Sequence, residues 1–347
     1  MTPIPGFPAL ARIDRSDRRR IRFDGDKAAA TLTGLVTNDV LALRDGGGQY
    51  ACALTPKGKI IAYVRILGVG AATGDTGAAA APNAGAMPPG VPPATLLVDT
   101  NAAAGTGLFD MIRKYVNPRL AKYADVTETT RCITLAGIGA PAAIAQLFGD
   151  GAATLATATP WSHVACMLGE ATVRVVVTPE LHDVPLYDLV VDAAHAAMLD
   201  DALAGTDAVT IDAATWDTAR IAAGRPAWGT DMDDATMPQE AEMDALGAIS
   251  YEKGCYTGQE TVARIHFRGH VNRHLRRVRI TGTTDLPPRG TELLADADNP
   301  VGDLRSTARL ADGTLIGIAM VRREIEPFSA LRTSGGASVL VLPLVPI

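Results

Sequence analysis

Residues 253–260 read Lys-Gly-Cys-Tyr-Thr-Gly-Gln-Glu and place Cys255 between two glycines, with Lys253 two positions before it. A nearby ammonium group or a helix N-terminus lowers a thiol pKa from about 8.5 into the range of roughly 3.5 to 7.5. The proline-free run 256–263 predicts a short helix whose amide groups face the cysteine, and Gly254 predicts a tight turn ahead of it. The stretch therefore predicts an exposed, activated thiol. The alternative is a tight loop around a buried, inert cysteine.

Longer motifs surround this stretch. Residues 216–232 read W-D-T-A-R-I-A-A-G-R-P-A-W-G-T-D-M, residues 237–240 read M-P-Q-E, and residues 268–276 read R-G-H-V-N-R-H-L-R. Further upstream, residues 34–40 read G-L-V-T-N-D-V and residues 54–59 read L-T-P-K-G-K. In this order the motifs resemble the YgfZ family of folate-binding proteins, which are relatives of the glycine-cleavage T-protein, a tetrahydrofolate-dependent aminomethyltransferase. The specific element of the resemblance is K-G-C-Y-x-G-Q-E.

The resemblance implies an α+β fold of the T-protein kind, in which three domains form a ring around a central folate channel. Two α+β domains are interleaved in sequence and an antiparallel β-barrel follows at the C-terminus. We assign residues 1–55 with 130–210 to the first, folate-binding α+β domain. Residues 56–129 with 211–270 form the second α+β domain, and residues 271–347 form the barrel.

Composition narrows the class of protein. The 347 residues leave room for two or three domains, and 47% hydrophobic with 20% charged residues is the composition of a globular chain. No apolar run approaches the roughly 18 to 20 residues that a membrane helix needs, and the N-terminus lacks an apolar signal segment, so we expect a cytoplasmic protein. The four cysteines are far apart, which argues against a disulfide scaffold or a self-contained metal cluster. Cys52, Cys132 and Cys166 are predicted to lie in the core.

Periodicity predicts the individual elements. Strand-like runs at 50–54 and 60–69 flank a Thr-Pro-Lys-Gly turn and predict a hairpin. Short strands broken by glycine and proline after residue 273 predict the barrel. The stretch 70–94 is rich in glycine, alanine and proline and predicts a flexible loop insertion. Other predicted elements are helices at 28–38, 102–114, 193–203 and 216–223 and strands at 95–99, 173–177 and 186–191.

Asp188 is the predicted pterin ligand. A pterin ring presents an amidine-like edge of N–H donors, which a carboxylate can accept in bidentate fashion. In the resemblance, Asp188 stands where the T-protein-like pattern has a glutamate that receives the pterin. The alternative is a strand residue that faces solvent. The resemblance implies Cys255 and Lys253 as the catalytic residues, and it implies further folate contacts at Asn38, Tyr256, Gln259, Arg264 and Arg268.

Residues 264–279 concentrate arginine and histidine in an otherwise acidic chain of net charge -6. The concentration predicts an anion partner, which is either the glutamate tail of folate or RNA phosphate. The alternative is a solvated strand face with surface ion pairs. His266, His270 and His274 have helical spacing, but Gly269 argues against a helix here, so no metal site is predicted.

One departure separates the two relatives. The T-protein resemblance leads us to expect a G-G-x-x-D-D-like segment with a catalytic aspartate, but residues 58–63 read G-K-I-I-A-Y and lack the carboxylate. Proton transfer by a positioned acid contributes about 100- to 10,000-fold in rate, so ordinary aminomethyltransferase activity is not expected.

The predicted function follows from this departure. The resemblance implies a tetrahydrofolate-binding accessory protein, rather than a conventional enzyme, that supports assembly or repair of iron-sulfur enzymes, including tRNA-modifying ones. Its partners would be folate and iron-sulfur client proteins or their assembly machinery, with no membrane. The alternative is a folate-dependent one-carbon transferase of the aminomethyltransferase or demethylase kind. Direct tRNA binding ranks last because the net charge is negative.

Overall fold

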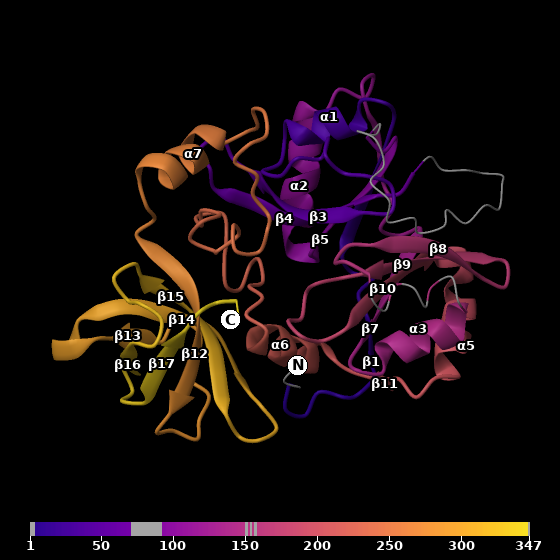
Figure 1. Cartoon of the computed structure of the whole chain (residues 1–347). Coiled ribbons are helices and arrows are strands. Elements are labelled where there is room, and N and C mark those ends of the chain that lie inside the picture. Colours follow the sequence, from indigo (N-terminus) through magenta and orange to yellow (C-terminus); the bar gives the residue numbers. More distant parts are fainter. Residues whose placement is uncertain (1–3, 71–91, 150–151, 153–154, 156–157, 346–347) are drawn as a thin grey trace.

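The computed structural model describes residues 4–70, 92–149, 152, 155 and 158–345, which form three lobes (Figure 1). The first lobe is built on an antiparallel sheet with the order β3-β4-β5-β2-β6. Its strands are β2 (Arg19–Asp24), β3 (Gly48–Leu54), β4 (Ile60–Gly68), β5 (Thr95–Thr100) and β6 (Lys122–Asp125). Helices α1 (Ala28–Thr33) and α2 (Ala102–Tyr115) share one apolar core with this sheet.

The second lobe is built on a six-stranded sheet with the order β11-β1-β7-β10-β9-β8. All its pairs are antiparallel except β1 with β11. The strands are β1 (Ala11–Asp14), β7 (Thr130–Ala136), β8 (His163–Leu168), β9 (Ala171–Val177), β10 (Leu186–Asp192) and β11 (Val209–Thr210). Helices α3 (Ala140–Phe148) and α5 (Ala196–Ala204), the latter preceded by the short 3-10 helix η2 (Ala193–His195), pack on one face of it.

The third lobe is the predicted C-terminal antiparallel barrel, closed in the order β12-β15-β14-β13-β16-β17. Its elements are β12 (Arg273–Thr281), β13 (Glu292–Leu294), η3 (Asp296–Asp298), β14 (Pro300–Arg309), β15 (Leu315–Arg322), β16 (Ala330–Thr333) and β17 (Ser338–Leu342). Helix α6 (Ala213–Ala222) contacts β14 and β15. Because Ala219 of α6 also packs with Leu181 and Leu186, this helix joins the barrel to the second lobe.

The segment between α6 and α7 (Gln259–Arg268) runs between the lobes (Figure 1). Its side chains Met232, Met243 and Ala248 are buried in one core with Tyr50 of β3 and Met320 of β15. The first lobe and the barrel are therefore held together through this segment. None of the described helices has the length and apolar character that a membrane crossing needs.

The predicted domain boundary at residue 55 differs from the strand pairing. It assigned β2 and β3 to the first α+β domain, with residues 130–210, but both strands pair within the other sheet. It also divides the β3–β4 hairpin, whose strands are hydrogen-bonded to each other. The chain leaves the six-stranded sheet between β1 and β2, at residues 15–18, and no glycine or proline marks that crossover in the sequence. The chain crosses back from the five-stranded to the six-stranded sheet between β6 and β7.

Two predicted helices have different bounds. The helix predicted over 28–38 ends at Thr33, because Val36 forms a bridge with Ala53 and the Thr37 amide donates to the Cys52 carbonyl. Pairing with the sheet edge thus overrides the helical pattern. The helix predicted over 256–263 begins at Gln259, four residues after Cys255. Of the predicted insertion at 70–94, residues 71–91 lie outside the described residues.

A contact between two glycines fixes the start of α7 against the β3–β4 turn. Gly258, with φ +84°, precedes the helix, and a Cβ atom there would lie 2.6 Å from the Thr55 carbonyl oxygen. Gly58, with φ +78°, is its neighbour, and a Cβ atom there would lie 2.9 Å from the Cβ of Thr261. Both a left-handed backbone and a close approach require glycine at these two positions.

Candidate functional site

The Lys-Gly-Cys motif is fastened to the end of α1. The Lys253 ammonium donates to the Val36 carbonyl at 2.7 Å and also to the Thr33 carbonyl. Carbonyl groups at a helix C-terminus have no partner within the helix, so a buried ammonium group satisfies them. In the same region the Thr257 amide donates to the Gly34 carbonyl at 3.2 Å.

Cys255 is exposed, which confirms the predicted accessibility and contradicts the alternative of a buried thiol. The helix amides predicted to face it do not begin there, because α7 starts four residues later. The neighbouring base is Lys253, and burial lowers its pKa to about 8 although Asp39 and Cys255 oppose the shift. A lysine with such a pKa exchanges a proton near physiological pH, which suits it to acid or base work beside a thiol.

We expect Cys255 to be the fastest-reacting thiol of the folded protein. Cys52 and Cys132 lie in the core as predicted, and burial raises the pKa of Cys52 far above its usual range and that of Cys132 to about 12. Cys166 is half-buried rather than in the core, and burial raises its pKa as well. Since the thiolate is the reactive form, a chromogenic disulfide reagent should detect one rapid thiol. That signal should vanish in Cys255→Ser; a rapid thiol that persists in this variant would contradict the expectation.

Charged side chains meet between the first two lobes and form what we call the charge cluster. Its members are Arg15, Arg18, Arg65, Asp99, Glu180 and Asp188. Arg65 on β4 and Asp99 on β5 belong to the five-stranded sheet, whereas Asp188 on β10 belongs to the six-stranded sheet. Because side chains alternate along a strand, each of these three points away from the helices that cover its own sheet. The two sheets therefore face each other across these charges.

Arg65 contacts all three carboxylates. Its Nε donates to Asp99 Oδ1 at 2.6 Å, and its Nη2 donates to the other oxygen of Asp99. Its Nη1 donates to Asp188 Oδ2 at 2.6 Å and to Glu180 Oε1 at 3.3 Å. The second oxygen of Asp188 accepts a hydrogen bond from Thr134 at 2.5 Å. Asp188 is 2% exposed, so the alternative of a solvent-facing residue is wrong.

The neighbouring arginines keep the carboxylates of Asp99 and Glu180 ionised. Burial alone would raise the pKa of Asp99, but Arg18 and Arg65 hold it far below its usual range. Burial likewise acts to raise the pKa of Glu180, but Arg15 and Arg65 lower it to about 2. An ionised carboxylate that is buried is stable only with such partners, since desolvation of an isolated charge is very costly.

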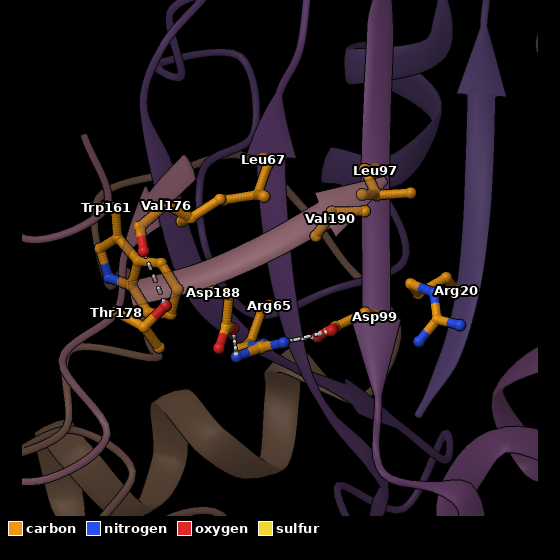
Figure 2. Close-up of a pocket in the computed structure, with 10 residues that line it drawn as sticks. All are labelled: Arg20, Arg65, Leu67, Leu97, Asp99, Trp161, Val176, Thr178, Asp188 and Val190. Carbon is orange, nitrogen blue, oxygen red and sulfur yellow. Dashed lines mark hydrogen bonds and ion pairs between the residues drawn. The ribbon is translucent and has the colours of Figure 1, made fainter. Parts of the chain in front are cut away.

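A small cavity lies beside Asp188. Its lining includes Arg65, Asp99, Trp161 and Thr178, and Figure 2 shows Arg65 between the carboxylates of Asp188 and Asp99. The cavity measures about 20 Å³. That volume holds about one water molecule, whereas ligand pockets usually measure about 300 to 1,000 Å³. In this conformation, the carboxylate predicted for the pterin faces Arg65.

The other predicted folate contacts lie around the Lys-Gly-Cys motif and not beside Asp188. The side-chain amide of Asn38 donates to the carbonyls of Tyr50 at 2.8 Å and Gly247 at 3.0 Å, so it joins β3 to the segment before α7. Tyr256 is buried, with Lys253 Nζ 4.4 Å from its ring centroid.

Strand β4 separates the two groups of predicted site residues. Gly58, beside the start of α7, is seven positions from Arg65, or about 23 Å along an extended strand. Gln259 opens α7, and Arg264 and Arg268 are exposed farther along that helix. The roles of these residues in folate binding stay predictions.

The arginines predicted to form one anion site are divided by the structure. Arg273 pairs with Glu240 and Arg276 with Glu242, while Arg277 donates to the carbonyls of Pro343 and Ala222. These three therefore fix β12 to its surroundings. Arg264 and Arg268 remain on the exposed face of α7.

The three histidines at four-residue spacing do not share a helix. His266 lies on α7, although no helix was predicted there, and His274 lies on β12. Within the described part of the chain, no three His, Cys, Asp or Glu side chains are grouped so that they could hold a metal ion.

Five members of the charge cluster were not among the predicted site residues: Arg15, Arg18, Arg65, Asp99 and Glu180. Arg65 and Asp99 each carry the lone charge in the core of an otherwise apolar strand run, Ile60–Gly68 and Thr95–Thr100. A charge in such a position must be paired when it is buried, and this signal could have identified both. Glu180 lies in a loop and carries no comparable signal.

About half of the chain is similar in sequence to curated proteins of Escherichia coli. The chain is 33% identical over 169 residues to the tRNA-modifying protein YgfZ of Escherichia coli O157:H7, a match that covers 48% of this chain and 51% of that protein. The YgfZ protein of Escherichia coli O6:H1 matches at 33% over 168 residues. The chain thus matches about half the length of these curated relatives. No protein-family model matches it.

A solved structure matches nearly the whole chain. The glycine cleavage system aminomethyltransferase T of Bartonella henselae superposes with a TM-score of 0.78 at 15% identity, covering 96% of this chain and 85% of that one. At 15% identity, this match supports a shared fold and nothing further. The predicted T-protein-like α+β fold with a C-terminal barrel is confirmed, and so is the resemblance to YgfZ.

Proposed function

We propose that the protein binds tetrahydrofolate between its first two lobes and supports the assembly or repair of iron-sulfur enzymes, including enzymes that modify tRNA. The observation that carries the proposal is the buried Asp188 carboxylate, which faces the junction of the two sheets in a T-protein fold. The name of the Escherichia coli relatives, tRNA-modifying protein, supports the tRNA setting.

The donor chemistry at Asp188 suits a pterin. A guanidinium group and the amidine-like edge of a pterin both present N–H donors to a carboxylate. A pterin would take the place of Arg65 Nη1 at Asp188, while Arg65 keeps its bonds to Asp99. At the margin of the cluster, Arg225 donates to the Glu180 carbonyl at 2.9 Å, and its buried Nη1 has no partner among the described residues. The cavity must widen for this exchange, so folate binding involves movement of Arg65.

Cys255 and Lys253 form the second part of the proposal. Iron-sulfur clusters use about four thiolate ligands, and a single exposed cysteine cannot supply them. Since Cys52 and Cys132 are buried, the remaining ligands at Cys255 would come from a client protein. Lys253 would hold the cysteine loop on α1 and exchange protons beside the thiol.

The test separates folate binding from the role of the cysteine. We expect anaerobic calorimetric titration to show saturable binding of tetrahydrofolate by the wild-type protein and, within about twofold, by Cys255→Ser. The exposed substitution should change stability by less than about 0.5 kcal/mol. In cells, Cys255→Ser should nevertheless lower the activity of iron-sulfur enzymes that thiolate tRNA, whereas the matched control Cys166→Ser should not.

Full activity of the tRNA-thiolating enzymes in cells that carry Cys255→Ser would contradict the proposed role of Cys255. Absence of tetrahydrofolate binding by the wild-type protein would contradict the proposed folate site. The same samples, given methylamine or aminomethyl donors, also test the one-carbon transferase alternative. That alternative requires formation of methylene-tetrahydrofolate, although Ala62 and Tyr63 supply no carboxylate where the T-protein pattern has one.

A further inference from the structure

The outward face of α7 combines exposed aromatic and cationic side chains. Phe267 is 66% exposed, and Arg264 and Arg268 lie within one turn of it on either side. Together with Glu260 and Ala263 they line an open hollow. Figure 1 shows α7 at the periphery of the molecule, above the barrel. An exposed aromatic ring flanked by two cations offers a surface for stacking next to groups that can contact phosphate.

Three rings meet at this face. The His266 ring stacks on that of Tyr251 with centroids 3.6 Å apart and planes at 14°. Phe267 stands edge-on to both, with its centroid 4.7 Å from that of His266 and 6.2 Å from that of Tyr251. The Tyr251 hydroxyl donates a hydrogen bond to Asp244 at 2.7 Å, which fixes the position of the stacked pair. The rings therefore form an ordered platform rather than a single mobile side chain.

The two arginines of this face, Arg264 and Arg268, do not form buried ion pairs among the described residues. Arg268 has no ion pair among the described residues, and the Arg264 pair with Glu260 is open to solvent on both sides. An ion pair of this kind contributes little and is readily exchanged. The Thr-Pro-Lys-Gly turn packs against the start of α7 and adds the exposed Lys57. In a chain of net charge -6, this is a local excess of positive charge.

We propose that the α7 face binds single-stranded nucleic acid. Unpaired bases would stack on Phe267 and on the His266–Tyr251 pair, and Arg264, Arg268 and Lys57 would contact phosphates. Stacking on aromatic side chains combined with cations along the backbone is the general mode of single-strand recognition, and it needs no sequence-specific readout. An acidic protein segment would satisfy the arginines but gives no role to the stacked rings. The site is distinct from the charge cluster and does not depend on folate binding at Asp188, and it assigns phosphate contacts to Arg264 and Arg268 in place of the folate contacts that the resemblance implied.

The experiment is a fluorescence-anisotropy titration of the full chain with fluorescein-labelled 12-nucleotide oligouridine at low salt. We expect affinity to fall with salt along a logarithmic slope of about -1.4 to -2.1, which corresponds to two or three phosphate contacts. Phe267→Ala should weaken binding about 5- to 150-fold, the range for loss of one stacked base. Phe328→Ala is the matched control, because Phe328 is 65% exposed on the barrel. Glu260→Gln should strengthen binding, since it removes a negative charge from the face.

Oligothymidine of the same length distinguishes RNA from DNA as the source of the single strand, and binding of either supports the site. The proposal is overturned if oligonucleotides do not bind at low salt, or if Phe267→Ala and Phe328→Ala bind alike. It is also overturned if a polyglutamate peptide competes as well as the oligonucleotide and Phe267→Ala has no effect, because the face would then bind acidic protein.

Discussion

Replacement of Arg65 by methionine is expected to lower the free energy of unfolding by about 3 to 5 kcal/mol, the usual cost of removing one partner from a buried ion pair. Methionine fills similar space, but Asp99, Glu180 and Asp188 lose their shared cation. Arg18 still pairs with Asp99, whereas Asp188 keeps the hydrogen bond from Thr134 and no cation. Urea denaturation followed by circular dichroism measures the difference.

Arg22→Met is the matched control for Arg65→Met. Arg22 lies in the same sheet and pairs with Asp24, but both side chains are partly open to solvent. Such a pair contributes about 0 to 1 kcal/mol. If the two variants lose the same stability, the charge cluster does not hold the lobes together.

Acid provides a second readout of the Arg65→Met experiment. The pKa of Glu180 is lowered from 4.5 to about 2, and the pKa of Asp99 is lowered further. A carboxyl group whose pKa is lower in the folded state contributes stability above its unfolded pKa and loses it as the pH falls through the folded pKa. The wild-type advantage over Arg65→Met should therefore shrink from about pH 4.5 to pH 2.

Asp188→Asn is expected to weaken tetrahydrofolate binding roughly 10- to 150-fold. A hydrogen bond to a charged group contributes about 1.5 to 3 kcal/mol, and the amide removes the charge and replaces one acceptor oxygen with a donor. The shape of the side chain is retained, and Arg65 keeps its bonds to Asp99. Calorimetric titration under anaerobic conditions measures the change.

Thr134→Val serves as the control for Asp188→Asn. It removes the hydrogen bond to Asp188 Oδ1 but leaves the carboxylate charge in place, so its effect on affinity should be smaller. Equal affinity of Asp188→Asn and the wild-type protein would show that the pterin is received elsewhere. Melting temperatures of both variants without ligand separate a loss of binding from a loss of fold.

The sequence predicted those parts of the fold whose signal is local. The β3–β4 hairpin, the barrel and helix α2 have their determinants within a few residues, through turn chemistry and periodicity. The T-protein architecture came from the resemblance of spaced motifs and not from periodicity. The accessibility of Cys255 was likewise inferred from a short motif.

The pairing of Arg65 with Asp188 could not be predicted in the same way. The two residues are 123 positions apart on different sheets. Alternation along each strand shows that a charge faces inward, but only the packing of one sheet on the other decides which charges meet. For the same reason, the sequence did not reveal that β2 pairs with β5 and β6 in the five-stranded sheet.

The contact between Gly58 and Gly258 limits which residues can occupy these two turns. Surface turns are usually where substitutions accumulate. Here, a side chain at Gly58 or at Gly258 would clash with the segment packed against it. Neither glycine can therefore be replaced unless the hairpin and α7 separate. Gly254 is different, because a Cβ atom there would meet nothing within 4 Å. In a family that kept all three glycines, Gly58 and Gly258 would be kept for the fold. Gly254 would be kept because it leaves space for a partner to approach Cys255.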